Sequence, residues 1–190
     1  MSIKLIVGLG NPGPEYEKTR HNAGVWLIDA IVSQYPTTLK NEKKFHGHSG
    51  KTQIAGQEVH LLIPNTFMNR SGLAVSALCN FYKIKAEEIL VAHDELDLEP
   101  GSVRLKCGGG HGGHNGLRDI IAQLGSKEFH RLRLGIGHPG NKNQVTSYVL
   151  GKPAKSEATA IEQSITDCLT QLDKIISGDH QAAMNLLHRN

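Results

Sequence analysis

The sequence predicts an α/β fold in a single domain: a mixed, largely parallel twisted sheet flanked by helices, with a functional crevice at the carboxyl ends of its strands. Three observations support this prediction. Short apolar runs alternate along the chain with segments in which apolar residues recur every three or four positions. Glycine-rich segments follow several of these runs, and such sheets bind ligands in loops at the carboxyl ends of their strands. The 190 residues also contain no internal repeat or linker that would divide the chain.

Four apolar runs are expected to be strands: residues 4–8, 58–63, 89–93 and 130–137. The first and third are almost wholly apolar, which is typical of strands covered on both faces. Helical spacing predicts helices over residues 22–34, 71–82, 117–124 and 161–176, with a short final helix from 179 to about 188. Gly178 is expected to end the longest of them. The domain is predicted to span residues 1–190, including the C-terminal helices from about residue 154.

The composition is that of an ordinary globular domain with a mildly basic charge. Hydrophobic residues make up 38% of the chain and the formal net charge is +3, so any nucleic-acid contact would need a local cationic patch. No apolar stretch approaches the length of a membrane span, and the three cysteines form no CxxC pair. We therefore expect a cytoplasmic, monomeric protein with reduced thiols, no membrane association and no implied protein partner.

Glycine and histidine are concentrated in three loops. The chain has 21 glycines and 11 histidines, and many of them lie in residues 8–13, 108–116 and 135–140. Glycine lets the backbone of such a loop approach a ligand closely. One glycine-rich loop could serve structure alone, but three on one small domain favour a functional site.

The first of these loops matches the bare spacing of a dinucleotide-binding motif. Gly8, Gly10 and Gly13 satisfy GxGxxG after a strand. Pro12 and Pro14 disfavour the helix that should begin there, and no acidic residue closes a second strand about twenty residues later. We therefore expect no nucleotide cofactor.

Two histidines of the second loop have a spacing found among metal ligands. His111 and His114 lie in a glycine run, without the helix that orients the pair in HExxH sites, so no metal is expected. The chain also has no GxSxG elbow, and no cysteine has the charged or helix-terminal setting of a nucleophile. These exclusions leave activation of water by a general base as the natural chemistry for an enzyme.

His21 is the candidate for that base. It lies between a proline-rich loop and a predicted helix, while Asn11 and Asp94 lie just past the ends of two apolar strands. If those strands are parallel neighbours, the polar side chains face one crevice. An imidazole can take a proton from water near neutral pH, and a carboxylate such as Asp94 would hold the useful tautomer. Glu95 and Asp97 lie further into an acidic turn and are expected to stay solvated.

Asparagines could position the water or stabilise an oxyanion without adding charge. The candidates are Asn11, Asn69 and Asn115. Taken singly, each fits better as a residue that stabilises its own loop through an Asx turn. The residue types alone therefore leave their role open.

Six segments, in order, give the chain a more specific likeness. They are residues 8–13 with Tyr16, 19–24, 66–72, 91–97, 108–115 and 131–137. On these segments the chain resembles the bacterial-type peptidyl-tRNA hydrolase family, from its first strand to about Lys152. The C-terminal part shares only helical character with the family. Small departures, such as Cys107 in place of an aliphatic residue, leave the candidate base and its neighbours intact.

The resemblance implies hydrolysis of the ester between a peptide and the 3′ end of tRNA, which releases both, without a cofactor or metal. By matching position, His21 is the general base, Asp94 keeps it in the proton-accepting form, and Asn11 helps to distinguish blocked from free α-amino groups. The expected contacts to substrate or tRNA are Tyr16, Phe67, Met68, Asn69, His114, Asn115, Lys106 and Arg133. Aromatic faces among them suit stacking of an unpaired base or an apolar wall for the peptide.

Phosphates of the tRNA would require cations. Five basic residues flank the glycine loops: Arg104, Lys106, Arg131, Arg133 and Lys142. Alternation along residues 131–134 places both arginines of that segment on one strand face. The alternative is an ordinary solvated face, and contacts to phosphate would be recognised by their sensitivity to salt.

Two other functions fit part of the pattern. An RNA-binding protein could keep this fold without catalysis, but it would have no need for the combination of His21, Asp94 and Asn11. A general esterase or amidase would have no need for the cationic strand face and the stacking residues. Hydrolysis of N-acetyl-aminoacyl-tRNA, with free aminoacyl-tRNA as the control, separates all three.

Overall fold

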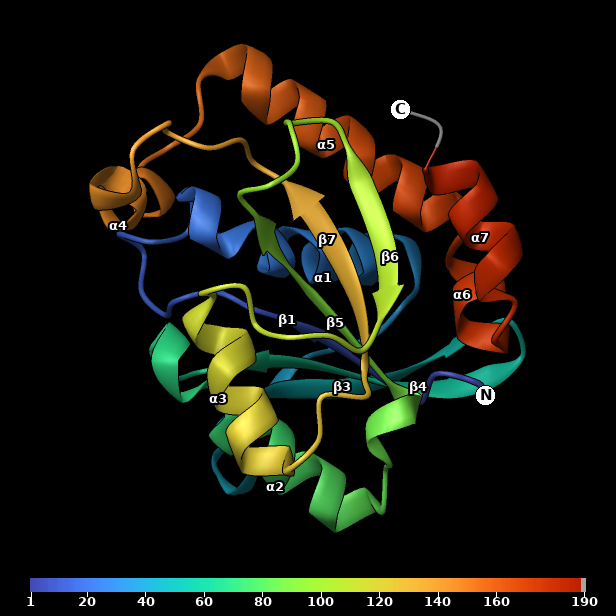
Figure 1. Ribbon diagram of the computed structural model, residues 1–190. Coiled ribbons are helices and arrows are strands. Elements are labelled where there is room, and N and C mark those ends of the chain that lie inside the picture. Colours follow the sequence, from blue (N-terminus) through green and yellow to red (C-terminus); the bar gives the residue numbers. More distant parts are fainter. Residues whose placement is uncertain (189–190) are drawn as a thin grey trace.

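The computed structural model describes residues 1–188 and contains one seven-stranded sheet. The strand order is β2-β3-β4-β1-β5-β7-β6. The strands are β1 (Leu5–Gly8), β2 (Lys40–Glu42), β3 (Gly47–Ile54), β4 (Gln57–Pro64), β5 (Ile89–Glu95), β6 (Val103–Cys107) and β7 (His130–Gly135). Figure 1 shows this twisted sheet at the centre of the molecule, with helices on both of its faces. The predicted α/β class with a mixed, largely parallel sheet is confirmed.

The four predicted strands form the parallel centre of the sheet. β1 lies between β4 and β5, and β5 pairs with β7, all in parallel register. The strands that the sequence did not indicate are β2, β3 and β6, which add antiparallel pairs at the two edges. Their sequences are short or largely polar, because an edge strand needs only one covered face.

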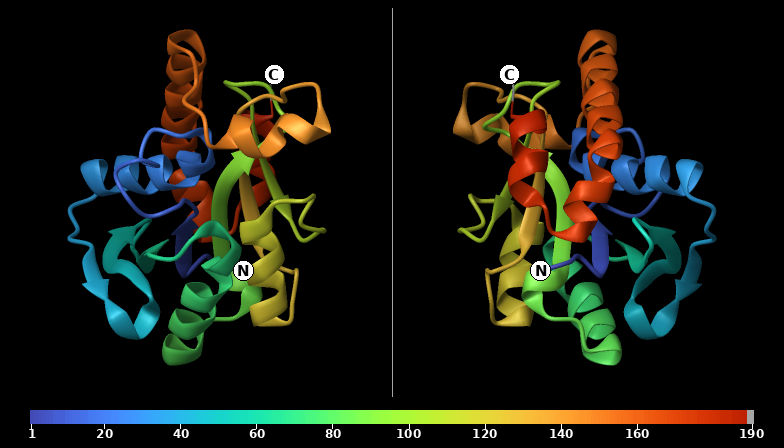
Figure 2. Two further views of the ribbon diagram at one scale, coloured as in Figure 1. Left: turned by 90° about the vertical axis from the view of Figure 1, so that its left-hand side faces the viewer. Right: turned by 90° about the vertical axis from the view of Figure 1, so that its right-hand side faces the viewer.

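Within residues 1–188, seven α-helices cover the sheet. They are α1 (Ala23–Gln34), α2 (Ser71–Tyr82), α3 (Asn115–Leu124), α4 (Val145–Val149), α5 (Lys155–Thr170), α6 (Leu172–Ser177) and α7 (His180–Leu187). Alternate residues of β1 face opposite cores: Ile6 packs with residues of α1, α5 and α6, whereas Leu5 and Val7 pack with residues of α2 and α3. Figure 2 shows the two groups from the side, with α2 and α3 together at the lower end and α5 at the upper end. No helix among residues 1–188 is long and apolar enough to cross a membrane.

Two expected elements differ in their bounds. The helix expected over residues 161–176 is two helices, α5 and α6, because Gln171 leaves the helical conformation (φ −103°, ψ 3°). Gly178 does end α6, in the left-handed conformation predicted for it (φ 94°). The last strand ends at Gly135 instead of residue 137, because the chain then pairs with the loop after β5: the N–H of Gly137 donates to the carbonyl of Leu98 at 2.8 Å.

A close contact between main chains fixes α1 against the sheet. A Cβ atom on Gly24 would overlap the carbonyl oxygen of Ala92 in β5, and a Cβ on Gly8 would overlap the carbonyl of Gly24. Glycine at positions 8 and 24 therefore lets the first turn of α1 rest on β1 and β5 with no side chain between them. This contact places the turn that precedes α1, residues 20–22, over the carboxyl end of β5.

Candidate active site

A cleft of about 320 Å³ opens at the carboxyl ends of β1 and β5. The predicted residues that line it are Asn11, His21, Phe67, Met68, Asn69, Asp94, His114 and Asn115. α4 and the residue that follows it form a further wall that the sequence did not indicate: Val145, Thr146, Val149 and Leu150. The cleft thus joins six separate segments of the chain at the predicted edge of the sheet.

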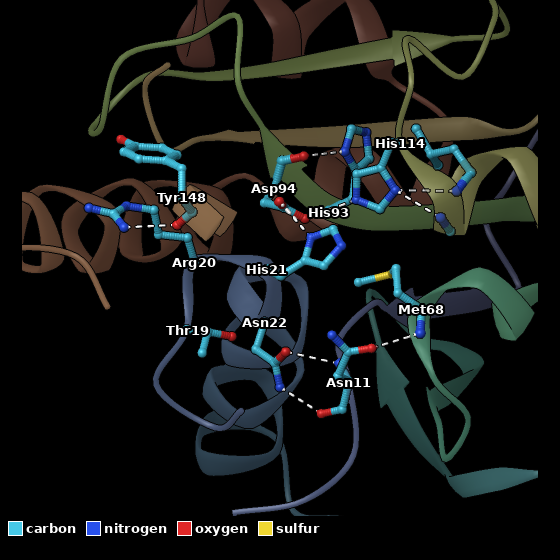
Figure 3. Close-up of polar contacts among 12 residues, drawn as sticks. Asn11, Thr19, Arg20, His21, Asn22, Met68, His93, Asp94, His114 and Tyr148 are labelled. Carbon is cyan, nitrogen blue, oxygen red and sulfur yellow. Dashed lines mark hydrogen bonds and ion pairs between the residues drawn. The ribbon is translucent and has the colours of Figure 1, made fainter. Parts of the chain in front are cut away.

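His21 lies in a 3-10 turn, Arg20–Asn22, directly before α1. The turn is closed by the N–H of Asn22, which donates to the carbonyl of Thr19 at 3.0 Å. The Asn22 side chain then holds the neighbouring loop: Oδ1 accepts from the N–H of Asn11 at 2.9 Å, and Nδ2 donates to its carbonyl at 3.0 Å. One asparagine therefore ties the loop of Asn11 to the turn of His21 (Figure 3).

Asp94 is the partner of His21, at 2.8 Å between Oδ2 and the imidazole Nδ1. Asp94 lies inside β5 and not past its end, so the expectation for its place along the chain was wrong by two residues. Burial lowers the pKa of His21, but the charge and hydrogen bond of Asp94 outweigh it, so the pKa is raised above its usual value. With Nδ1–H donating to Asp94, neutral His21 carries its lone pair on Nε2.

His114 holds the other oxygen of the same carboxylate, at 2.9 Å between its Nε2 and Oδ1 of Asp94. Its Nδ1 accepts the N–H groups of Gly116 (3.1 Å) and Leu117 (3.3 Å) at the N-terminus of α3. A nitrogen that accepts cannot carry a proton, so His114 is neutral and its Nε2–H donates to Asp94. Both nitrogens of this predicted substrate contact are therefore engaged within the protein.

Two histidines thus stabilise the ionised form of a buried carboxylate. Burial alone would raise the pKa of Asp94, but the interactions with His21 and His114, each of which donates a hydrogen bond to the carboxylate, hold it well below its usual range. Asp94 is 3% exposed. The site consequently contains a fixed negative charge beside His21.

His93 completes a row of three histidines and was not singled out from the sequence. Its Nδ1–H donates to the carbonyl of Asp94 at 2.8 Å, and its ring lies 5.1 Å from that of His114. Burial and the nearby His114 lower its pKa to about 4, so it is neutral at pH 7. His93 lies within segment 91–97 of the family resemblance. What distinguishes it is its burial beneath the cleft, which only the folded structure shows.

Asn11 directs a donor into the cleft. Its Oδ1 accepts the N–H of Met68 at 2.7 Å, which leaves the two Nδ2–H donors on the side of His21 (Figure 3). Met68 itself is buried, with 4% exposure, and fills space beneath the loop. Asn69 and Asn115 are exposed on the walls of the cleft.

Phe67 is the exposed aromatic surface of the cleft. Its side chain is 59% exposed and meets the ring of Tyr16 edge to face, with 6.3 Å between centroids. Phe67 lines the cleft directly, whereas Tyr16 supports it from outside the lining. The two predicted stacking residues are therefore in contact, but only Phe67 presents its ring to the cleft.

A second cleft of about 310 Å³ adjoins the first and contains three of the predicted cations: Lys106, Arg131 and Arg133. Arg131 is buried, and its guanidinium donates to the carbonyls of Gly109, Gly110 and Lys127, so it supports the glycine loop instead of presenting free charge. Arg133 pairs with Glu95 at 2.9 Å. The expectation that Glu95 is merely solvated was therefore wrong, because Arg133 lowers its pKa against the effect of burial.

The geometry also bears on metal binding. Within residues 1–188, one group of side chains could offer three ligands to a metal ion: His21, Asp94 and His114. His111, which the sequence paired with His114, is not part of it. Two imidazoles and a carboxylate are suitable ligands for a transition metal. However, the two N–O distances of 2.8 and 2.9 Å are those of hydrogen bonds, and each imidazole engages a different carboxylate oxygen.

This arrangement defines the class: an α/β protein in which a carboxylate-held imidazole faces a cleft suited to hydrolysis. A family model described as peptidyl-tRNA hydrolase matches residues 5–190. Peptidyl-tRNA hydrolases of Chromohalobacter salexigens and of a Marinomonas strain are 56% and 58% identical over 187 residues, with 98% of this chain and 96% of each relative covered. The crystal structure of peptidyl-tRNA hydrolase from Acinetobacter baumannii has a TM-score of 0.96 and 52% identity, covering 98% of this chain and 95% of that one. The chain belongs to the peptidyl-tRNA hydrolase family.

Proposed function

We propose that this enzyme hydrolyses the peptide–tRNA ester with His21 as its general base. The observation that carries the proposal is the bond from His21 Nδ1–H to Asp94, which leaves the Nε2 lone pair to take a proton from water. The resulting hydroxide attacks the ester carbonyl, and Asp94 stabilises the imidazolium that forms. When the tetrahedral intermediate collapses, the imidazolium returns the proton to the departing ribose oxygen, which completes the cycle.

Asn11 would bind the substrate next to the reacting ester. Its Oδ1 is fixed by the N–H of Met68, so its Nδ2–H donors are oriented for a carbonyl oxygen. A carbonyl is what a blocked α-amino group offers and a free ammonium lacks. Asn69 and Asn115 supply further polar contacts on the cleft walls, and the face of Phe67 can stack on a base of the acceptor end.

Substrate selectivity is the direct test of this function. We expect turnover of N-acetyl-aminoacyl-tRNA and much slower turnover of the free aminoacyl-tRNA, measured as release of labelled amino acid. Turnover of neither would contradict the enzyme function and favour a protein that only binds RNA. Equal turnover of small esters without tRNA would instead indicate a general esterase.

Lys106 and Arg133 are proposed to bind tRNA phosphate in the second cleft. Lys106 is exposed there and Arg133 is partly exposed, whereas Arg131 is engaged with the glycine loop. We expect Lys106→Ala to raise KM several-fold with little change in kcat, and to make KM less sensitive to salt, because one phosphate contact is lost. Lys40→Ala, at an exposed lysine of the far edge strand β2, is the matched control. An unchanged KM and salt slope would remove Lys106 from the tRNA site.

A chelator tests whether His21, Asp94 and His114 act through hydrogen bonds or through a metal. In the hydrogen-bonded arrangement, dialysis against EDTA should leave kcat unchanged within about twofold, because no step requires a Lewis acid. The measurement is turnover before and after dialysis, followed by addition of zinc. Loss of activity that zinc restores would assign these three residues to a metal centre.

A further inference from the structure

Arg20, the residue before the proposed base, connects the turn of His21 with the α4 wall of the cleft. Its guanidinium carbon lies 3.9 Å from the centroid of the Tyr148 ring, and Nη1 donates to the Tyr148 carbonyl at 2.9 Å. Its backbone N–H donates to the carbonyl of Gly151 at 3.0 Å. Figure 3 shows Arg20 and Tyr148 together beside Asp94 and His21. Side chain and main chain of one residue therefore bind the same short segment.

The α4 wall is attached to the core by three side chains: Val149 belongs to the core, and Val145 and Tyr148 pack against it. Of its five residues only Val149 is buried, yet Val145, Thr146 and Val149 line the cleft opposite the glycine loop. Tyr148 adds a polar attachment, because its hydroxyl donates to the carbonyl of Ile136 at 2.7 Å. Tyr148 is thus held on one side by the end of β7 and on the other by Arg20.

The surroundings of Arg20 favour this stacked arrangement. Its side chain is 12% exposed, and its ion pair with Glu157 is long, at 3.4 Å. A Cβ on Gly151 would come within 3.1 Å of Nη1, so glycine at that position leaves room for the guanidinium. Nε is buried without a hydrogen-bond partner among residues 1–188. The guanidinium therefore stacks on the Tyr148 ring, although this position leaves its Nε–H donor without a partner.

We infer that Arg20 is a positioning residue for hydrolysis: it holds the turn of His21 and the α4 wall as one unit, so that the base is aligned when substrate lies against the wall. This inference rests on the proposed role of His21. Planar stacking and a directed N–H fix the guanidinium more rigidly than an ammonium group could. The role concerns the rate of the chemical step and not the affinity for tRNA, since Arg20 lines neither cleft.

The test is Arg20→Lys, which keeps the charge beside Glu157 but loses the planar stack. We expect kcat for N-acetyl-aminoacyl-tRNA to fall about tenfold, with KM within about twofold, because small misplacement of a base is costly. The pH profile of kcat should shift to lower pH, since a looser bond to Asp94 raises the His21 pKa less. Ser147→Ala, at the exposed neighbour of Tyr148 whose hydroxyl stays within its own turn, should keep full turnover.

A double variant, compared with both single variants at matched folded fractions, tests whether Arg20 and Tyr148 act as one unit. Tyr148→Ala removes the stacking surface from the other side, so Arg20→Lys combined with Tyr148→Ala should be no slower than the slower single variant. Full activity of Arg20→Lys, a loss confined to KM, or multiplicative losses in the double variant would each overturn the proposal. Near-normal turnover of His21→Ala would instead contradict the base assignment, so the two failures are distinguishable.

Discussion

Replacing His21 by alanine is expected to lower kcat by a factor on the order of 10² or more, while tRNA binding stays close to normal. The reason is geometric: Nε2 of His21 has the free lone pair that faces the cleft, because Nδ1 is committed to Asp94. No other histidine of the cluster can replace it. His114 has both nitrogens engaged, and His93 is buried.

Single-turnover rates and a filter-binding assay with uncleaved tRNA measure the two quantities separately. His48→Ala, in β3 at the far side of the sheet, is the matched control and should keep normal turnover. In the unmodified enzyme kcat should fall as pH drops through the raised pKa of His21, because the imidazolium cannot accept a proton. Near-normal turnover by His21→Ala, or persistence of this acid limb in the variant, would remove His21 from the mechanism.

Asp94→Asn is expected to lower kcat by roughly 10²- to 10⁴-fold, because it forces His21 into the wrong tautomer. His114 cannot change its own tautomer, since its Nδ1 accepts two N–H groups at the start of α3. Its Nε2–H must therefore donate to the new amide oxygen, and the amide NH₂ is left facing His21. Nδ1 of His21 would then accept a hydrogen bond, and Nε2 would carry the proton.

A second substitution separates this explanation from general damage to the fold. With His114→Ala added to Asp94→Asn, the amide can turn so that its oxygen accepts from His21 Nδ1–H again. We expect the double variant to be faster than Asp94→Asn alone, although loss of the α3 cap should cost about 1 kcal/mol of stability. Turnover is measured at matched folded fractions, judged by circular dichroism. A double variant slower than Asp94→Asn would contradict the tautomer argument.

The centre of the fold could be predicted from the sequence, because β1, β4, β5 and β7 are runs of apolar residues with helices between them. The edge strands could not, since β3 carries glycine, serine and lysine and depends for its place on pairing with β4. The same limit applies to the break at Gln171, which leaves the apolar spacing of the two helices uninterrupted.

The pairing of His21 with Asp94 could likewise be predicted, but not the hydrogen bonds around these two residues. Residue types and strand ends indicated His21 and Asp94. The bonds of His114 to Asp94, of Arg131 to the glycine loop and of Arg20 to Tyr148 each join residues at least 20 positions apart in the chain. Each of these side chains has several possible partners, and only the packed fold decides among them.

The direct contact of Gly24 with Ala92 has an evolutionary consequence. Side chains of a core can exchange volume with their neighbours as substitutions accumulate, and the elements that they separate shift accordingly. Here two main chains meet without an intervening side chain, so the distance between the turn of His21 and the strand of Asp94 does not depend on which residues fill the core. The pairing of His21 with Asp94 is therefore insulated from drift in the hydrophobic interior, and selection at positions 8 and 24 should tolerate glycine alone.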